Sequence, residues 1–365
     1  MRSESEAEAA PRGIPWNERE VRAAVGLRAT AGRPALAFSE ISTDTRTLRP
    51  GALFVALTGE RFDGHEHLGA AAAAGAAAAV VRRGTGEVAG LALLPVDDPL
   101  TAYGDLARAR RRTLSGPVVA VTGTNGKTST KEMLAAVLRT RWRSHATRAN
   151  LNNLVGVPAT ILEAPADTEA LVVEAGANRP GEIARYREII EPTVTVITNA
   201  VAGHLEGFGS LAGVLAEKLS LAREVPLAVV GIRPPGLAAG ARRVAGRVIT
   251  AGFEGADRAP DAVRLDDLGR ATVEVDGRRF RLPYPGRHLA ENAMLGWTVG
   301  RELRLDAGAA AAALERFTLP PGRSDLRQEG GLTILNDCYN ANPDSFGAAI
   351  ATARELRRGR RLVMV

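Results

Sequence analysis

Short runs of consecutive apolar residues recur along the chain, and segments with helical spacing separate them. The clearest runs are Val118–Val121, Ala170–Val173, Val194–Thr198 and Leu227–Val230. Continuous apolar runs are typical of parallel strands that are buried on both faces. Because helical patterns lie between these strands, the alternation predicts an α/β fold with a doubly wound parallel sheet.

The same pattern divides the chain into a tail and three units. Residues 1–13 are polar and acidic and are expected to be a disordered tail. A small α/β unit follows over residues 14–98, the doubly wound sheet occupies residues 99–319, and a third unit begins over residues 320–365. The elements expected in the first unit are strands at Gly51–Leu57, Ala78–Val81 and Leu91–Val96 and a helix in the alanine block Ala70–Ala79, and a helix over Pro99–Leu114 is expected to lead into the central sheet.

The third unit contains few predicted elements. They are a strand over Leu332–Leu335, a helix from Phe346 to Arg358 and a final apolar strand over Arg361–Val365. Roughly 45 residues are fewer than the 50 or more of a typical domain. We therefore expect the chain to be truncated within this unit.

The segment Pro117–Met133 joins one predicted strand to a helix through a turn that contains two glycines. Glycine permits φ > 0 and close backbone approach, and the amides at a helix start face an anion. Lys127 adds a positive charge, and the hydroxyl of Thr128 can bind Mg²⁺. The order of strand, turn and helix predicts a nucleotide-phosphate site. The usual P-loop pattern has a glycine where this chain has Val121, and an ordinary βα loop is the alternative interpretation.

The lysines of the chain carry a second signal. Of 47 lysine and arginine residues only three are lysines, namely Lys127, Lys131 and Lys218. A lysine in so arginine-rich a chain indicates chemistry that a planar, permanently charged guanidinium cannot provide, such as a compact phosphate contact or a nucleophilic amine. Lys127 suits the first role and Lys218 is the candidate for the second, whereas Lys131 is expected on the helix surface.

Polar side chains follow the predicted strands at the edge where ligands bind in doubly wound sheets. Glu174 comes directly after one strand and Asn199 after the next, with His204 five residues further on. A carboxylate after a buried strand beside a P-loop is typical of a Mg²⁺ ligand, and a helix cap is the alternative for Glu174. His204 is predicted to be a site residue, although an isolated histidine is often only a satisfied polar group.

Composition excludes several classes of protein. The chain is 45% hydrophobic and 4% aromatic, so its cores are expected to be aliphatic, and no apolar run reaches the roughly 18 residues of a membrane span. The single cysteine, Cys338, excludes an internal disulfide framework and indicates a cytoplasmic location. The net charge of +6 is not accompanied by a series of stacking aromatics, which argues against nucleic-acid binding. The basic residues 108–112 are expected on a solvated helix end.

Several motifs together resemble the Mur ligase family. In chain order they are Ser42–Arg46, Phe62–His65, Thr122–Thr128, Asn150–Pro158, Glu174–Asn178, His204–Ser210, Lys218, Gly286–His288 with Asn292, Gly322–Arg323 and Tyr339–Pro343. Each motif alone is weakly specific, whereas the ordered set is very specific and covers the chain from about Ser42 onward. Leu289 and Ala175 depart from the residues that are usual in the family at those positions.

The resemblance implies an ATP-dependent amide ligase, similar to the members that join D-alanyl-D-alanine to UDP-N-acetylmuramoyl-tripeptide. The tripeptide carboxylate would be phosphorylated, the dipeptide amine would attack the acyl phosphate, and a tetrahedral intermediate would collapse to the peptide and phosphate. Positive charge must then gather around the transferred phosphoryl group. The resemblance also implies a UDP-binding N-terminal domain, a central P-loop ATPase domain and a Rossmann-like C-terminal domain.

The resemblance carries site residues over as well. Those implied for ATP are Gly123, Thr124, Asn125, Gly126, Lys127, Thr128 and Ser129 in the loop, Asn292 at the adenine side, and Arg323 and Asp337 at phosphate and ribose. Two Mg²⁺ ions are implied, with Thr128 and Glu174 resembling the ligands of one and His204 those of the second. Lys218 matches the position of a carbamylated lysine in the family, and a carbamate offers oxygen donors to a hard metal ion. The catalytic residues that the resemblance implies are Lys127, Glu174, His204 and Lys218.

Substrate contacts are implied on two segments. Ser42, Asp44 and Arg46, with the loop Phe62–His65, resemble the uridine-diphosphate site, and Asn150, Asn152 and Asn153 resemble contacts on the substrate side. We expect a monomer. A truncated chain is expected to bind the nucleotide sugar but to show little ligation.

Three alternatives stay open beside this interpretation. The diamino-acid-adding ligases of the family usually have Asp-His-Leu-Asp and Tyr-Ala-His-Thr-Pro where this chain has His204–Gly209 and Tyr339–Pro343. Folylpolyglutamate synthase is another relative, but it would not need the Ser42–His65 domain. The third alternative is a nucleotide-controlled binding switch, against which the paired metal ligands and Lys218 argue.

Overall fold

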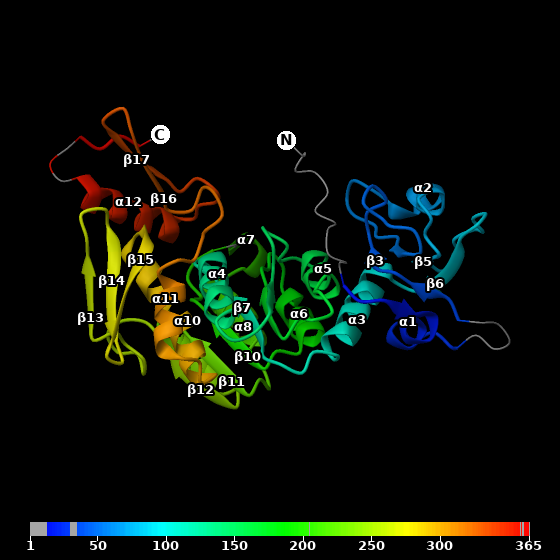
Figure 1. Ribbon diagram of the computed structural model, residues 1–365, viewed down its shortest axis with the longest axis horizontal. Helices are drawn as coiled ribbons and strands as arrows, with labels where there is room; N and C mark the ends of the chain where they lie inside the picture. The colour runs from blue at the N-terminus through cyan, green and yellow to red at the C-terminus, as the bar shows by residue number, and fades with distance from the viewer. Residues whose placement is uncertain (1–12, 30–34, 204, 358, 360, 365) are drawn as a thin grey trace, which may run out of the picture. The chain divides into compact units, whose positions relative to one another are not determined.

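The computed structural model describes residues 13–29, 35–203, 205–357, 359 and 361–364 (Figure 1). It divides into two compact units, one formed by residues 1–115 with 154–168 and the other by residues 116–153 with 169–365. The two units are described separately. None of the described helices has the length and apolar character that a bilayer span requires.

The first unit is built on a four-stranded parallel sheet with the order β3-β4-β5-β6. Its strands are β1 (Trp16–Asn17), β2 (Ala37–Phe38), β3 (Ile41–Ser42), β4 (Leu53–Val55), β5 (Ala78–Arg82) and β6 (Ala92–Val96), and its helices are α1 (Glu18–Ala24), η1 (Gly64–His67), α2 (Leu68–Ala73), α3 (Pro99–Arg111) and α5 (Gly156–Leu162). The expected strands are confirmed. The alanine block forms a shorter helix than its length suggests, because the chain turns at Gly75, whose φ of +88° suits glycine.

Two of the four arginines at the end of α3 are buried, so the expected solvated helix end is wrong for Arg110 and Arg111, whereas Arg112 is exposed. Arg110 is 2% exposed and Arg111 is 8% exposed. The Arg110 guanidinium donates to the carbonyl oxygens of Ala164 and Pro165, at 3.2 and 3.1 Å, and ties α3 to the segment after α5. A guanidinium is tolerated inside the unit because it pairs with several backbone carbonyls at once.

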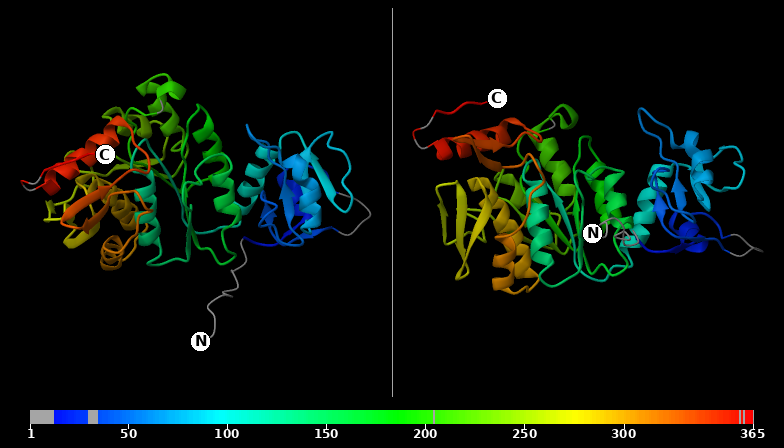
Figure 2. Two further views of the ribbon diagram at one scale, coloured as in Figure 1. Left: turned by 90° about the horizontal axis from the view of Figure 1, so that it is seen from above. Right: turned by 45° about the horizontal axis from the view of Figure 1, so that its top comes forward.

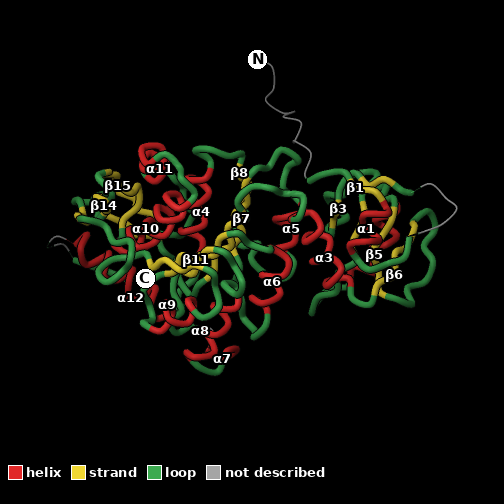
Figure 3. Tube along the Cα trace, turned by 90° about the horizontal axis from the view of Figure 1, so that it is seen from below, coloured by secondary structure: helices red, strands yellow, loops and turns green. Residues whose placement is uncertain are grey.

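The second unit contains the predicted doubly wound sheet, with the order β12-β11-β10-β7-β9-β8 and every pairing parallel. Its strands are β7 (Val118–Thr122), β8 (Ser144–Ala146), β9 (Ala170–Glu174), β10 (Val194–Ile197), β11 (Leu227–Val230) and β12 (Arg247–Thr250). Figure 3 shows α4 (Lys127–Leu138), α10 (Arg287–Glu302) and α11 (Ala307–Leu314) on one side of this sheet and α6 (Glu182–Ile190), α8 (Leu211–Ser220) and α9 (Gly236–Arg242) on the other. All residues of β7 are buried, as a strand covered on both faces requires.

Helix α4 is buried along most of its length between the sheet and α10. Met133, Leu134 and Val137 are fully buried in the main core cluster. Lys131 is only 1% exposed and its ammonium pairs with Glu132, so the expectation of a helix-surface position is wrong. The long aliphatic stem of lysine lets the residue lie inside the helix interface while the ammonium reaches a carboxylate.

An antiparallel sheet that the strand–helix alternation did not indicate follows the parallel one. It has the order β13-β14-β15, with strands β13 (Ala262–Leu265), β14 (Arg270–Val275) and β15 (Arg278–Pro285). Alternate residues of β14 are buried, as in a sheet with one covered face. Phe280 stacks on Trp297 of α10 with 5.6 Å between ring centroids, which packs this sheet onto the helix that faces the P-loop.

The end of the chain forms a hairpin and a helix beside the antiparallel sheet. The two views of Figure 2 show the hairpin of β16 (Asp325–Glu329) and β17 (Leu332–Asn336), with α12 (Pro343–Arg357), next to β13–β15. Leu356 of α12 is buried and lies near Gly269. The expected strand over Arg361–Val365 is wrong for residues 361–364, which are exposed and form no strand, and Val365 lies outside the described residues.

Candidate active site

The turn between β7 and α4 is packed so closely that glycine is required at two positions. A Cβ at Gly123 would lie 2.0 Å from Oγ1 of Thr198, and a Cβ at Gly126 would lie 2.6 Å from Oδ1 of Asn292. The φ of Gly126 is +77°, in the left-handed region that glycine favours. The predicted glycine turn is therefore present, and it leads directly into the start of α4.

Residues after β10 hold this turn in place. The amide of Thr124 donates to the carbonyl oxygen of Asn199 at 3.1 Å, and the amide of Asn125 donates to the Asn199 side chain at 3.1 Å. The hydroxyl of Thr198 donates to the carbonyl oxygen of Asn125. The strand-end residue Asn199 thus orders the loop.

Lys127 lies across the turn. Its Nζ donates to the carbonyl oxygens of Gly123 and Thr124, both at 2.9 Å. Desolvation by the surrounding chain lowers the pKa of Lys127, Glu174 opposes this shift, and Arg323 adds to it. These two charges therefore lie within electrostatic range of the lysine, and the turn concentrates positive charge where an anion would bind.

Glu174 is the last residue of β9 and is 1% exposed. Its Oε1 accepts a hydrogen bond of 2.7 Å from the Asn152 amide, while its backbone amide donates to Oγ1 of Thr147 at 2.9 Å. Its Oε2 is buried and has no hydrogen-bond partner among the described residues. A buried carboxylate oxygen without a donor fits a hard divalent cation, and Thr128 lines the same pocket as Glu174.

Lys218 is 2% exposed on α8, and its Nζ lies 5.6 Å from the ring centroid of Phe208. Burial, with a further contribution from Lys127, lowers the pKa of Lys218 to about 7, although Glu217 and Glu182 act in the opposite direction. The lowered pKa raises the share of the uncharged amine near neutral pH, which is the state in which an amine is a nucleophile. His204, the other predicted residue of this region, lies outside the described residues.

A large pocket of about 530 Å³ surrounds the turn. The predicted residues that line it are Thr124, Asn125, Gly126, Lys127, Thr128, Ser129, Asn150, Asn152, Asn153, Glu174, Asn292, Arg323 and Asp337. Lys218 does not line it directly. The tertiary structure therefore brings together positions that span more than 200 residues of the chain.

The C-terminal segment supplies one wall of this pocket. The guanidinium of Arg323 lies 4.2 Å above the ring of Tyr339, and its Nε is buried without a hydrogen-bond partner among the described residues. Asp337 accepts a hydrogen bond of 2.9 Å from the amide of Ser324. His288 lines the same pocket, and burial lowers its pKa while Asp337 acts in the opposite direction.

A polar contact between this segment and the P-loop was missed at the sequence level. Nδ2 of Asn342 donates to Oδ1 of Asn125 at 2.6 Å, and Nδ2 of Asn125 donates to Asp344 at 2.8 Å. Arg233 forms an ion pair of 3.1 Å with Asp344. Turn chemistry at Asn342 is also present, because its side chain accepts from the amide of Ser345 at the start of α12. The motif Tyr339–Pro343 could be recognised in the sequence. Nothing in the sequence indicated that Asn125 of the loop would be its hydrogen-bond partner.

The residues predicted for uridine diphosphate lie in the first unit and cluster with one another. The hydroxyl of Ser42 and the backbone of Asp44 form a hydrogen-bonded turn. Arg46 forms an ion pair of 2.6 Å with Asp44, and this hydrogen bond is the main reason that the pKa of Asp44 is lowered to about 2. The Arg46 side chain is 85% exposed, so its remaining donors are open to an anionic ligand.

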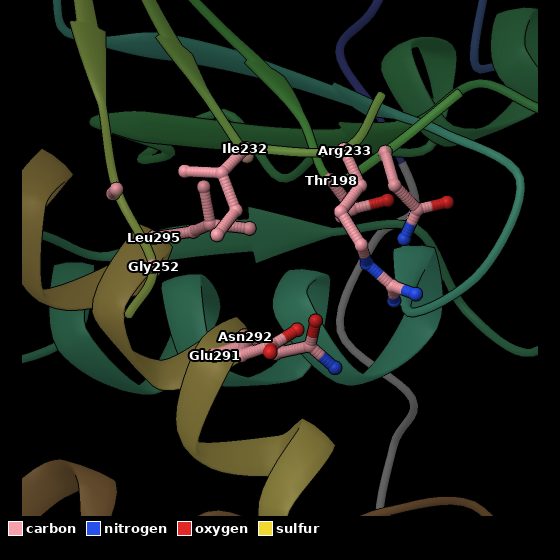
Figure 4. A pocket seen from close by; sticks show the side chains of 10 residues that line it. Thr198, Ile232, Arg233, Gly252, Glu291, Asn292 and Leu295 are labelled. Atoms are coloured by element: carbon pink, nitrogen blue, oxygen red, sulfur yellow. The ribbon is translucent and has the colours of Figure 1, made fainter. Parts of the chain in front are cut away.

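A smaller cavity adjoins the large pocket and shares Asn199, Arg233, Glu291 and Asn292 with it. Figure 4 shows Glu291 and Asn292 together at one side of this cavity, with Arg233 opposite and the apolar side chains of Ile232 and Leu295 completing the wall. The sequence analysis identified Asn292 but not Glu291 or Arg233.

Comparison with known proteins extends over both units. The Mur ligase family, catalytic domain, matches residues 37–111, and the Mur ligase middle domain matches residues 121–300. A protein of Bacillus subtilis named UDP-N-acetylmuramoyl-tripeptide–D-alanyl-D-alanine ligase is 35% identical over 322 residues, covering 87% of this chain and 70% of its own. This chain belongs to the Mur ligase family. The ligase of the same name from Escherichia coli is 35% identical over 339 residues, covering 89% of this chain and 74% of its own.

Solved structures of Mur ligases agree with this assignment. MurF from Acinetobacter baumannii superposes with a TM-score of 0.85 at 30% identity and covers 95% of this chain and 78% of its own. MurF ligase from Thermotoga maritima in complex with ADP superposes with a TM-score of 0.78 at 29% identity, covering 87% of this chain and 74% of its own. A diaminopimelate ligase and a folylpolyglutamate synthase, both at 18% identity, share the fold alone.

Proposed function

We propose that this chain is the ATP-dependent ligase that joins D-alanyl-D-alanine to UDP-N-acetylmuramoyl-tripeptide. Both substrates are those named for relatives with 35% identity. The single observation that carries the proposal is the pocket around Lys127, in which the P-loop, the unpartnered carboxylate oxygen of Glu174 and Arg323 meet. The diamino-acid-adding ligase is less well supported, since its solved relative shares only 18% identity with this chain.

The first chemical step is phosphorylation of the tripeptide carboxylate by ATP. The carboxylate oxygen attacks the γ-phosphorus, the bond to the β–γ bridging oxygen breaks, and ADP and an acyl phosphate result. Both reacting groups are anions, so the site must neutralise charge. Lys127 and the amides at the start of α4 are proposed to hold the phosphates, and Arg323, which lines the same pocket, is proposed to add positive charge.

Thr128 and Glu174 would hold Mg²⁺ in this site. When bound, the ion supplies a positive charge that draws the phosphate oxygens together and withdraws electron density from the γ-phosphorus. Asn152 orients the Glu174 carboxylate through its hydrogen bond to Oε1 and leaves Oε2 without a donor. The family implies a second ion near His204 and Lys218.

Lys218 is proposed to be carbamylated. Its uncharged amine attacks the carbon of CO₂, the nitrogen loses one proton to solvent, and a carbamate with one negative charge forms. The lowered pKa supports this reaction because the uncharged amine is well populated near pH 7. The product replaces a buried cation by an oxygen ligand, which removes the repulsion from Lys127.

The second step is attack by the D-alanyl-D-alanine amine on the acyl carbon. A tetrahedral intermediate forms, the amine loses a proton, and phosphate leaves as the amide bond closes. Asn150, Asn152 and Asn153 line the pocket beside Glu174 and are proposed to position the acyl group. Ser42, Asp44 and Arg46 are proposed to bind the uridine diphosphate in the first unit.

The proposal is tested by phosphate release and by the mass of the products. The purified chain is incubated with ATP, Mg²⁺, UDP-N-acetylmuramoyl-tripeptide and D-alanyl-D-alanine, and a Lys218→Arg variant serves as control. We expect phosphate release that requires both substrates, a pentapeptide product, and loss of both in the variant. Absence of nucleotide-sugar binding would favour the binding switch instead.

A further inference from the structure

Two neighbouring residues of α8, Glu217 and Lys218, are buried although both have ionisable side chains. Glu217 is 6% exposed and Lys218 is 2% exposed. Successive residues on a helix point about 100° apart, so these two side chains leave α8 in different directions. The Glu217 carboxylate reaches the start of α6, which Figure 3 shows on the same side of the central sheet as α8. The proposed reaction uses Lys218 but assigns no role to Glu217.

The carboxylate of Glu217 caps α6 from a different helix. Its two oxygens accept hydrogen bonds from the backbone amides of Gly181 at 2.9 Å and Ile183 at 2.8 Å. The first amides of a helix have no partner within it, and the N-cap residue of α6, Gly181, has no side chain to supply one. Hydrogen bonds from amides to a charged acceptor are about twice as strong as neutral ones. The start of α6 is therefore held firmly to α8.

The start of α6 is in turn joined to the large pocket. Glu182, its first residue, accepts hydrogen bonds from the amides of Asn178 at 2.7 Å and Arg179 at 3.1 Å. These bonds fix the end of the segment that begins at Glu174, the last residue of β9. Glu174, Asn178 and Glu182 all line the pocket. Glu217 thus connects α8 to the pocket wall that holds the proposed metal ligand.

Lys218 has few contacts of its own that could fix its ammonium group. The ring centroid of Phe208 lies 5.6 Å from Nζ, and among the described residues the ammonium forms no hydrogen bond and no ion pair. A single cation–π contact stabilises less than a pair of hydrogen bonds to a charged group. The position of Lys218 therefore depends on how α8 is held.

We propose that Glu217 is a positioning residue that caps α6 and thereby fixes α8, and with it Lys218, relative to Glu174. The inference rests on the proposed function for the role of Lys218 in ligation. Without the carboxylate, two amides of α6 lose their acceptor and Lys218 leaves its place above the Phe208 ring. A catalytic group displaced by about 1 Å can lower a rate by up to about a hundredfold.

The position of Lys218 is measured by NMR on the full chain with ¹³C-labelled lysine, because only three lysines give signals. The ring current of Phe208 shifts the ε-methylene protons of Lys218, and Phe208→Leu removes this shift. The ring contribution is the difference between chains with and without Phe208→Leu, recorded at about pH 5, where the lysine is charged in every variant. Glu217→Ala is expected to abolish most of this contribution and to leave the signals of Lys127 and Lys131 unchanged.

Ligation gives the second readout. Glu217→Ala is expected to lower kcat about tenfold and to change the KM for ATP by about twofold at most, because the P-loop is untouched. Glu188→Ala removes an exposed carboxylate of the same α6 and is expected to keep both the ring contribution and kcat. Glu217→Gln keeps the side-chain volume and one acceptor oxygen, and intermediate values are expected from it if the alanine variant fails to fold.

The two readouts separate positioning from capping alone. An unchanged ring contribution in a folded Glu217 variant overturns the proposal, because the carboxylate would then be only a helix cap. An unchanged kcat beside a reduced ring contribution overturns it as well, since Lys218 would have moved without effect on the reaction. Absence of ligation by the unaltered chain would overturn the proposed function, and the NMR comparison would still decide whether Glu217 fixes Lys218.

Discussion

The Asn152 amide donates a hydrogen bond of 2.7 Å to one carboxylate oxygen of Glu174 and leaves the other oxygen buried without a partner among the described residues. The two residues lie 22 positions apart, one in a loop and one at the end of β9. A buried oxygen without a partner lowers the stability of the fold unless a hydrogen-bond donor or a cation binds it. The hydrogen bond therefore fixes the carboxylate and keeps Oε2 available for the proposed cation.

Glu174→Gln is predicted to weaken the Mg²⁺ dependence of ATP binding. The amide is a neutral and poorer ligand for a hard cation, so the gain in ATP affinity on adding Mg²⁺ is expected to fall about tenfold. Calorimetric titration of ATP with and without Mg²⁺ measures this gain. Glu169→Gln, just before β9, is the matched control, and an unchanged gain in the Glu174 variant would show that the carboxylate is not a ligand.

Lys218 is predicted to make the chain more stable at alkaline pH. Its pKa falls from 10.5 to about 7 on folding, so between these values the unfolded state binds one more proton than the folded state. The free energy of unfolding then rises with pH from about 7 to 10.5, by up to about 1.4 kcal/mol per unit, and the contribution is flat below pH 7. Urea unfolding in CO₂-free buffer, compared with Lys218→Met, isolates this slope. The same slope in both proteins would contradict the prediction.

Asn125→Ala is predicted to loosen the start of α12. The variant removes the side-chain contacts to Asn342 and Asp344 but keeps the cap that Asn342 forms with Ser345. Loss of about 1 kcal/mol corresponds to roughly fivefold faster amide exchange near the start of Pro343–Arg357. Hydrogen-exchange mass spectrometry measures this rate. Exchange at the wild-type rate would show that the loop does not hold the helix.

Arg110→Met is predicted to destabilise the first unit by about 2 kcal/mol, because the buried carbonyl oxygen of Ala164 and the partly buried one of Pro165 lose a hydrogen bond from the guanidinium. Hydrogen exchange is expected to rise in α3 and in residues 154–168 but not in the central sheet. Arg112→Met changes an exposed residue of the same helix end and serves as control. Equal effects of the two variants would contradict the structural role of Arg110.

Much of the fold was predictable because buried parallel strands have a local signature. The runs that became β7, β9, β10 and β11 are apolar at nearly every position, and each was predicted to within one residue. The antiparallel sheet β13–β15 was missed, although β14 alternates, because its strands follow a long series of strand–helix repeats. The expected surface positions of Arg110 and Lys131 were wrong because burial of a long cationic side chain depends on distant carbonyl or carboxylate partners.

The sequence by itself determined the order of the elements, the phosphate-binding turn and the residues that follow each strand, since these depend on side-chain pattern and on neighbouring backbone. Only the tertiary structure decided which of them meet. It brought Asn342 onto Asn125, left one oxygen of Glu174 without a partner among the described residues, and placed Glu291 at the wall of a small cavity. Desolvation and charge act through space, so the lowered pKa of Lys218 and the raised pKa of Glu291 follow from packing and not from sequence position.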